Sequence, residues 1–292
     1  MKKILVLKGG GAKGMIQVSC MAELEKQGFN LVNTNLKVGT SVGSIDSSAL
    51  ALGMKTEELI DCYPEMLKMV FNTPWYPTFP KYKRSNFDKA WGKFFNLYIK
   101  MKDVKNKLII TSVDRCTSKP HFFKSWEDKD GELTLTSVIK RSFAAPYYFG
   151  QINDPEEQKV WVDGGCGIDS LPLEYAYFEA DLQGWLSYPI EFICIGTGFS
   201  RRGTPYKEAS KENTIRQVLD FFNLPNGGMA REMSSWEQID RIARLAKKHK
   251  TIKFLYYDIQ IPEDADGMDK LKYLDKYIIW GREMSKKPLI EF

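Results

Sequence analysis

The segment Gly39-Thr40-Ser41-Val42-Gly43 places a serine between two glycines, directly after a short apolar run and before a helix-like run. The pattern G-x-S-x-G is typical of a nucleophile elbow, a sharp strand-to-helix turn that exposes the serine hydroxyl. Glycines two residues to either side keep the neighbouring backbone from clashing, and the dipole of the following helix favours a developing oxyanion. A tight turn without chemistry is the alternative interpretation.

A glycine cluster, Gly9-Gly10-Gly11-Ala12-Lys13-Gly14, follows the first apolar run of the chain. Its spacing matches the G-x-G-x-x-G fingerprint of dinucleotide-binding folds. Such a site also needs an acid at the end of the next strand to hold the ribose, but that strand ends in Lys37-Val38-Gly39 without an acid. A Walker phosphate loop is excluded because Met15 follows the last glycine. Adjacent glycines can also aim backbone N–H groups at one point and so form an oxyanion hole beside a nucleophile.

An activated serine needs a base, and the chain has only two histidines, His121 and His249. His121 lies in a strand-like run, and His249 lies at the basic end of a helix, where cations favour the carbonyl terminus. Asp163 is a better candidate because it follows its own strand and is followed by two glycines at a sharp turn. A partly desolvated carboxylate can act directly as a general base. An Asp-Gly turn between strands is the alternative.

Apolar runs that alternate with amphipathic runs predict the elements that must position these residues. We expect strands at 2–8, 36–38, 108–113, 121–124, 160–162, 190–195 and 252–261, and helices at 15–27, 136–145, 173–180 and 268–284, with one ending at Gly53 and one starting at Thr56. Strands alternating with helices indicate an α/β fold with a largely parallel sheet covered on both faces. The strand ends at one edge of such a sheet converge on a crevice.

The 292 residues fit one large domain or two small ones, and the 43% apolar content is enough for a sizeable core. No repeat or low-complexity linker divides the chain. We therefore expect a single domain over residues 1–292, with a motif-bearing core at about 3–200 and a helical C-terminal part at about 205–292.

Composition excludes several other classes of protein. The longest apolar runs have about five residues, against the ~18 of a membrane span, and the first run is too short for an export signal, so we expect a cytoplasmic protein. Scattered cysteines and two histidines predict no zinc site. The acidic turns 127–131 and 263–267 lack ligands of a calcium loop and are expected to be surface turns. A net charge of +5 does not imply nucleic acid.

The positive charge is concentrated in one stretch. From Lys81 to Lys107 there are nine lysines or arginines and only two acids, and this stretch overlaps ten aromatic residues between Phe71 and Tyr98. Trp and Tyr favour the headgroup zone of a bilayer, and lysines are attracted to anionic lipid. Peripheral membrane contact is one interpretation, with three residues as lid candidates: Trp75, Tyr76 and Phe79. The alternative is that the aromatic residues are core and the lysines a solvated face.

These segments together resemble the patatin-like phospholipase family. Gly9–Gly14 resembles its oxyanion loop, Gly39–Gly43 its serine elbow, and Asp163-Gly164-Gly165 its D-G-G/A motif. Weaker similarities occur at Ser142-Phe143-Ala144-Ala145-Pro146 with Phe149 and at Ile195-Gly196-Thr197-Gly198. The motifs stand in the family's order over roughly residues 3–200. Lys13 replaces the usual arginine, which keeps the charge but loses bidentate geometry.

The resemblance implies a three-layer α/β/α fold and a Ser-Asp dyad that cleaves acyl-ester bonds of lipids without histidine, calcium or another cofactor. Asp163 would take the proton from Ser41, and the N–H groups of Gly10 and Gly11, with Gly9 as a third candidate, would stabilise the oxyanion. The substrate would be a phospholipid or another acyl lipid.

Three other functions are kept as alternatives. An α/β-hydrolase with a Ser41-Asp163-His249 triad has the right chain order, but its elbow follows several strands, whereas only two strands are expected before Ser41. The second is a dinucleotide-binding oxidoreductase. The third is a non-catalytic module on the same fold that binds lipid or protein.

Overall fold

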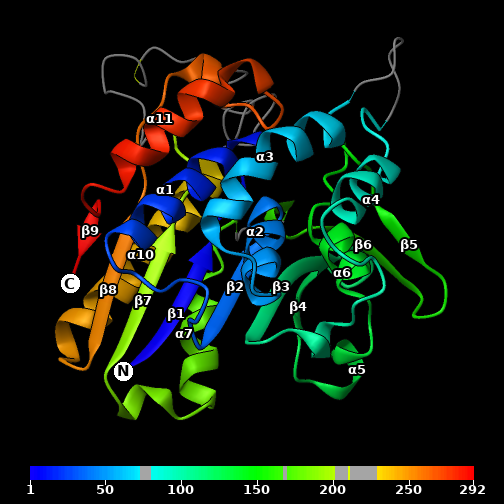
Figure 1. Cartoon of the computed structure of the whole chain (residues 1–292). Coiled ribbons are helices and arrows are strands. Elements are labelled where there is room, and N and C mark those ends of the chain that lie inside the picture. The colour runs from blue at the N-terminus through cyan, green and yellow to red at the C-terminus, as the bar shows by residue number, and fades with distance from the viewer. Residues whose placement is uncertain (73–79, 167–169, 201–209, 211–228) are drawn as a thin grey trace.

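A nine-stranded mixed sheet forms the centre of the molecule (Figure 1), in the order β5-β6-β3-β2-β1-β7-β8-β9 with β4 paired to β3. The computed structural model describes residues 1–72, 80–166, 170–200, 210 and 229–292. The strands are β1 (Lys2–Leu7), β2 (Leu36–Thr40), β3 (Lys107–Asp114), β4 (Lys119–Lys124), β5 (Ile152–Asp154), β6 (Lys159–Asp163), β7 (Ile190–Ile195), β8 (Ile252–Tyr257) and β9 (Ile290–Glu291).

Helices cover both faces of this sheet. They are α1 (Gly14–Lys26), α2 (Val42–Ala51), α3 (Thr56–Val70), α4 (Ser85–Gly92), α5 (Asp128–Gly131), α6 (Leu135–Ser142), α7 (Leu173–Leu182), α10 (Met229–Lys248) and α11 (Leu274–Met284). Figure 1 shows α1, α3 and α11 on one face, with α7 and α10 on the other. None of the helices in the described ranges is long and apolar enough to cross a bilayer.

Alternating side chains of the central strands fill two hydrophobic cores. Leu5 and Leu7 of β1 lie in the core beneath α1, α2, α3 and α11. Ile4 and Val6 lie in the core beneath α7 and α10. Burial on both faces explains why the central strands read as continuous apolar runs. The predicted α/β/α fold with a mostly parallel sheet is confirmed, since β1, β2, β3, β7 and β8 run parallel.

Strand β6 runs antiparallel to β3, which the sequence interpretation did not foresee. β3 pairs with β2 as far as Thr111, and then with β6 from Ser112 to Asp114, while β4 pairs with β3 along the same stretch. Because a strand has only two hydrogen-bonding edges, β6 must take the edge that β2 has left. The end of β6 therefore arrives directly beyond the end of β2.

Several other elements differ from expectation. The short helix α4 was not predicted, although it buries Phe87, Ala90 and Trp91 on one side. The C-terminal part contains the strand expected at 252–261, which is β8 and ends at Tyr257, and also the strand β9, which was not predicted and pairs with β8. The closing helix begins at Leu274, later than expected, because short 3-10 turns at 263–265 and 271–273 precede it.

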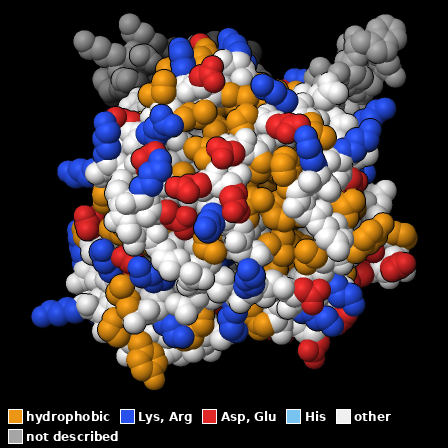
Figure 2. All heavy atoms as spheres, in the orientation of Figure 1, with side chains coloured by type: hydrophobic (Ala, Val, Ile, Leu, Met, Phe, Trp, Pro, Cys, Tyr) orange, Lys and Arg blue, Asp and Glu red, His pale blue; other side chains and the backbone are white. Residues whose placement is uncertain are grey.

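The aromatic residues of the basic stretch are buried or half-buried where the structure describes them, except for the exposed Tyr98, whereas most of its lysines lie at the surface. Four of its aromatic residues are buried: Phe71, Tyr82, Phe87 and Trp91. Four of its lysines form ion pairs with acids: Lys81, Lys93, Lys100 and Lys102. Figure 2 shows positive and negative side chains interspersed on the face it presents. The lid candidates Trp75, Tyr76 and Phe79 lie outside the described residues.

Helix α2 carries a fully buried acid, Asp46. Among the described residues, neither of its carboxylate oxygens makes a hydrogen bond of good geometry, and the buried Tyr63 hydroxyl is the polar group that interacts with it. Burial raises the pKa of Asp46 well above its usual value, and Tyr63 opposes this shift only in part. The folded protein therefore holds a proton on Asp46 at a pH where the unfolded chain has released it.

We expect Asp46→Asn to stabilise the protein by an amount that grows as the pH rises from about 4, the ordinary pKa of aspartate, towards neutrality. The folded state binds more protons than the unfolded state in that range, so the stability of the native protein falls with rising pH. The asparagine variant has no ionisable group at position 46 and therefore lacks this fall in stability with rising pH. Melting temperatures of both proteins between pH 4 and 8 measure the difference.

Asp61→Asn, on the exposed side of α3, is the matched control. An Asp46→Asn variant whose melting temperature tracks the native protein at every pH would contradict the prediction.

Candidate active site

Ser41 occupies the turn between β2 and α2 with φ 54° and ψ −121°. Positive φ is uncommon for a residue with a side chain and marks a strained backbone, as in a nucleophile elbow. The Ser41 carbonyl accepts hydrogen bonds from the Ser44 backbone N–H at 2.9 Å and from the Ser44 hydroxyl at 2.6 Å. The first turn of α2 thus helps to hold the strained conformation.

The two flanking glycines are required by space rather than by φ. A Cβ on Gly39 would lie 2.2 Å from the Gly43 carbonyl oxygen, and a Cβ on Gly43 would lie 2.3 Å from the Leu7 carbonyl oxygen. Real side chains do not approach this closely. The G-x-S-x-G spacing therefore lets α2 turn back against β2 and β1.

Asp163 is hydrogen-bonded directly to Ser41. The Ser41 Oγ donates to Asp163 Oδ2 at 2.7 Å, and both residues are only 4% exposed. Asp163 Oδ1 accepts the Gly165 backbone N–H at 2.7 Å, which orients the carboxylate. A Cβ on Gly164 would lie 2.4 Å from the Thr111 hydroxyl, so this glycine lets the turn after β6 close against β3.

The segment after α6 contacts both members of this pair. The Ser41 backbone N–H donates to the Ser142 hydroxyl at 2.9 Å, and the Asp163 backbone N–H donates to the Ala144 carbonyl at 3.1 Å. Ser142 is fully buried. The sequence analysis treated Ser142–Pro146 only as a weak similarity, without a role for these two contacts.

The glycine cluster lies beside Ser41. A Cβ on Gly9 would lie 3.1 Å from the Ser41 Cβ. Within the described residues, no acceptor is recorded for the backbone N–H groups of Gly10 and Gly11, whereas the Gly9 N–H donates to the Ser170 carbonyl at 2.9 Å. Gly9 is thus engaged elsewhere in this conformation, which leaves Gly10 and Gly11 as the two available donors.

Residues outside the cluster hold it in place. The Thr197 hydroxyl donates to the Gly9 carbonyl at 3.0 Å, and a Cβ on Gly10 would lie 2.2 Å from that hydroxyl oxygen. Gly14 begins α1, and a Cβ there would lie 2.3 Å from the Tyr63 hydroxyl oxygen. Lys13 is buried and pairs with Asp266. Asp266 belongs to the turn 263–267, which we expected at the surface. Glu263 and Asp264 are exposed as expected, whereas the Asp266 side chain is turned inward to Lys13.

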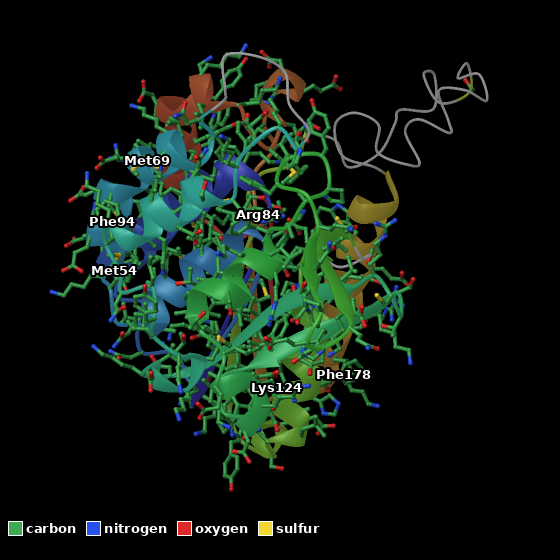
Figure 3. The ribbon with its side chains drawn as sticks, turned by 90° about the vertical axis from the view of Figure 1, so that its right-hand side faces the viewer. Met54, Met69, Arg84, Phe94, Lys124 and Phe178 are labelled. Atoms are coloured by element: carbon green, nitrogen blue, oxygen red, sulfur yellow. The ribbon has the colours of Figure 1, made fainter. Side chains whose placement is uncertain are left out.

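An apolar pocket opens beside Ser41. It is lined by Gly11, Ser41, Val42, Ile45, Tyr63, Met66, Leu67, Val70, Phe71, Phe143, Phe149 and Met268. Its cavity volume is about 30 Å³. One water molecule needs about 10–15 Å³ by this measure, so the pocket has room for about two waters, and its walls must part to admit a longer group. Arg84, labelled in Figure 3, donates to the carbonyls of Phe149, Gly150 and Gln151 and so fixes the loop that supplies Phe149.

Neither histidine belongs to this site. His249 precedes β8 at the opposite edge of the sheet, where Ile252 pairs with Ile190. The proposed Ser41-Asp163-His249 triad is therefore wrong. His121 packs against Phe123 and Trp161 and faces Asp130 at 3.6 Å. The described part of the chain contains no group of acids, cysteines or histidines that could hold a metal ion.

Comparison with known proteins yields a family match and several relatives. The model of the family described as patatin-like phospholipase matches residues 5–177. A cGAMP-activated phospholipase of Vibrio cholerae is 30% identical over 189 residues, covering 56% of this chain and 53% of that protein. One of the same name from Escherichia coli is 28% identical over 183 residues, covering 56% and 51%. Patatin-like protein 4 of Arabidopsis thaliana is 24% identical over 254 residues, covering 71% and 63%.

The chain spans about half the length of the two bacterial relatives. The family match covers more than half of this chain, and it contains the glycine cluster, the serine elbow and Asp163. The chain belongs to the patatin-like phospholipase family.

Proposed function

We propose that this protein hydrolyses carboxylic ester bonds of membrane lipids, as a phospholipase A or lysophospholipase, through a Ser41-Asp163 dyad. The observation that carries the proposal is the buried 2.7 Å hydrogen bond from Ser41 to Asp163, beside two N–H groups without a recorded acceptor in the described chain. A hydroxyl within hydrogen-bond reach of a carboxylate, with oxyanion donors adjacent, meets the geometric needs of acyl transfer.

In the first half of the reaction, Asp163 takes the proton of the Ser41 hydroxyl while Oγ attacks the ester carbonyl carbon. The carbonyl oxygen becomes an oxyanion that accepts the N–H groups of Gly10 and Gly11. The tetrahedral intermediate then collapses, the bond to the alcohol oxygen breaks, and Asp163 returns the proton to the departing lysophospholipid or other alcohol. The acyl group stays on Ser41 as an ester.

In the second half, a water molecule gives its proton to Asp163 and attacks the acyl-enzyme carbonyl. The same two N–H groups stabilise the second oxyanion. Collapse releases the fatty acid, and Asp163 returns the proton to the Ser41 Oγ. The dyad is thereby restored, and the sum of the steps consumes one ester and one water.

The pocket supports a lipid as the source of the acyl group. Its walls are almost wholly hydrocarbon, with the face of α3 and the rings of Phe71, Phe143 and Phe149 around Ser41. An acyl chain gains free energy from such a lining, about 0.8 kcal/mol for each methylene group buried. A charged or sugar-like substituent would find few hydrogen-bond partners there, since the polar groups of the lining are those of Gly11, Ser41 and Tyr63.

The names of the two bacterial relatives bear on how the assay is run. Both are called cGAMP-activated phospholipases. We therefore include this nucleotide as an arm of the ester assay, since a narrow pocket is what a resting enzyme would show. Turnover only in the presence of cGAMP would extend that property to this chain.

Ser41→Ala and Asp163→Asn are each expected to lower kcat for a short-chain ester by about 10³-fold or more. The first removes the nucleophile, and the second removes the base while the amide oxygen can still accept the Gly165 N–H. Circular dichroism and the melting temperature check that both variants stay folded.

A fluorophosphonate probe should label the native protein at Ser41 and leave the alanine variant unlabelled. Near-native turnover by either folded variant would overturn the dyad. A native protein that binds liposomes but takes no label would favour a non-catalytic lipid-binding module instead.

Ser142→Ala is expected to lower kcat about tenfold with little change in KM. The change leaves the Ser41 N–H buried without its acceptor, and an unsatisfied buried donor costs about 1–3 kcal/mol, which destabilises the strained turn. Ser137→Ala is the matched control, because this serine of α6 bonds only its own helix at Thr134. Equal kcat values for the two variants would contradict a positioning role for Ser142.

Val70→Phe is expected to narrow the pocket and to lower kcat/KM for a long-chain nitrophenyl ester about tenfold more than for the acetate. Val70 lines the pocket from α3, and an overfilled apolar site costs about 1–3 kcal/mol. Met69→Phe is the control, because Met69 (Figure 3) is half-buried on the same helix but does not line the pocket. Unchanged chain-length preference would place the acyl chain elsewhere.

A further inference from the structure

The segment Glu263–Lys270, here called the acidic segment, joins β8 to α11 and lies directly against the glycine cluster. The Ala12 backbone N–H donates to the Met268 carbonyl at 2.6 Å. Gly11 has φ +61°, and a Cβ on it would lie 2.3 Å from the same Met268 oxygen. Gly11 must therefore be glycine for two reasons, its left-handed backbone and the close approach of Met268.

A buried ion pair fastens the acidic segment to the same turn of chain. Lys13 Nζ pairs with Asp266 Oδ1, and the two side chains are 11% and 17% exposed. The other oxygen of Asp266 accepts the Ser200 backbone N–H at 3.2 Å and the Ser200 hydroxyl at 2.5 Å. Burial would raise the pKa of Asp266, but Lys13 and Ser200 together hold that pKa below its usual value. The carboxylate is thus charged and fully engaged.

The other end of the acidic segment is fastened to the wall of the pocket. Asp269 Oδ2 accepts Lys81 Nζ at 2.5 Å and the Tyr82 hydroxyl at 2.8 Å. The Tyr82 ring packs against Phe71 and Phe149, which line the pocket. The acidic segment therefore spans from the aromatic wall to the glycine cluster, and it is held at both ends.

We propose that Asp266 is a positioning residue for the oxyanion hole, acting through Lys13, and that Met268 completes this clamp with its backbone carbonyl. The inference rests on the proposed function, because it concerns the geometry in which Gly10 and Gly11 meet the oxyanion. A run of three glycines has no side chains to pack and is conformationally permissive. Oxyanion donors act only if they are held in place before the reaction. The Lys13–Asp266 ion pair and the hydrogen bond from Ala12 to Met268 restrain the chain at the two residues that directly follow the donors Gly10 and Gly11.

The decisive variants are Asp266→Asn, Lys13→Met and the double variant, with Asp264→Asn as the matched control. Asp264 lies in the same segment and its carboxylate also accepts a hydrogen bond, but from the Tyr273 hydroxyl, in an exposed position away from the glycine cluster. We expect Asp266→Asn to lower kcat about tenfold to a hundredfold with KM changed less than twofold, since a displacement of about 1 Å can cost 10²-fold. Asp264→Asn should keep native kcat.

The double variant separates positioning through Lys13 from general damage. If Asp266 acts through Lys13, Lys13→Met and the double variant should lose about as much kcat as Asp266→Asn alone, because the same interaction is removed each time. Losses that multiply in the double variant would overturn the proposal. So would a fall in melting temperature with native kcat at a temperature where the variant is folded, since that result assigns Asp266 a structural role only.

Amide hydrogen exchange of the peptide containing Gly9–Lys13 tests the clamp without any need for turnover. Asp266→Asn should speed exchange in this peptide at least tenfold, and Asp264→Asn should not. Unchanged exchange overturns the inference even if the native protein is an active esterase. Native protein without ester turnover or Ser41 labelling overturns the proposed function instead, and the exchange result then decides whether Asp266 holds the loop. Faster exchange with native kcat in an active enzyme overturns the positioning role.

Discussion

One edge of strand β3 is shared by two strands, and the geometry of the proposed active site follows from that arrangement. β2 occupies the edge as far as Thr111, and β6 approaches from the opposite direction and occupies it from Ser112 onward. Ser41 directly follows β2, and Asp163 is the last residue of β6. The ends of these two strands therefore bring the Ser41 hydroxyl and the Asp163 carboxylate to within 2.7 Å of each other. In the proposed dyad no histidine is needed between the two side chains, because the backbone places them in direct hydrogen-bond contact. The Ser142–Pro146 segment then holds each partner by one backbone N–H.

Local sequence patterns were sufficient for features that depend on local geometry. Gly39 is required by its close approach to Gly43 in the same turn, and Gly43 by its close approach to Leu7 of the neighbouring strand β1. Both requirements fall within the five-residue G-x-S-x-G pattern, which could therefore be recognised from the sequence. The central strands were recognisable because both of their faces are buried, and the sheet with its helical layers followed. The proximity of Ser41 and Asp163 was also expected, but for a different reason. A parallel sheet edge was assumed, whereas β6 is antiparallel, and no single-strand pattern reveals the direction of pairing.

Features that depend on distant parts of the chain could not be predicted. Asp266 looked like one acid of an exposed turn, and its burial depends on Lys13, which lies 253 residues earlier. Gly9 was a third candidate donor besides Gly10 and Gly11, and only the tertiary fold shows that its N–H donates to the Ser170 carbonyl. The aromatic residues Tyr82 and Trp91 were as consistent with a membrane surface as with a core, and only tertiary packing decided between the two. Helix α4 was too short and too aromatic to be recognised by its periodicity.

The acidic segment follows both Ser41 and Asp163 in the chain, and this order has a consequence for biosynthesis. The ribosome completes Ser41 and Asp163 roughly one hundred residues before it reaches Asp266 and Met268. At the usual rate of about 5–20 residues per second, the nascent chain carries both members of the dyad for several seconds without the clamp on its glycine cluster. If the clamp holds the Gly10 and Gly11 N–H groups in place, the time needed for translation delays the onset of catalytic activity. Full activity would then be acquired only after synthesis has passed Met268 and the acidic segment has folded against the glycine cluster.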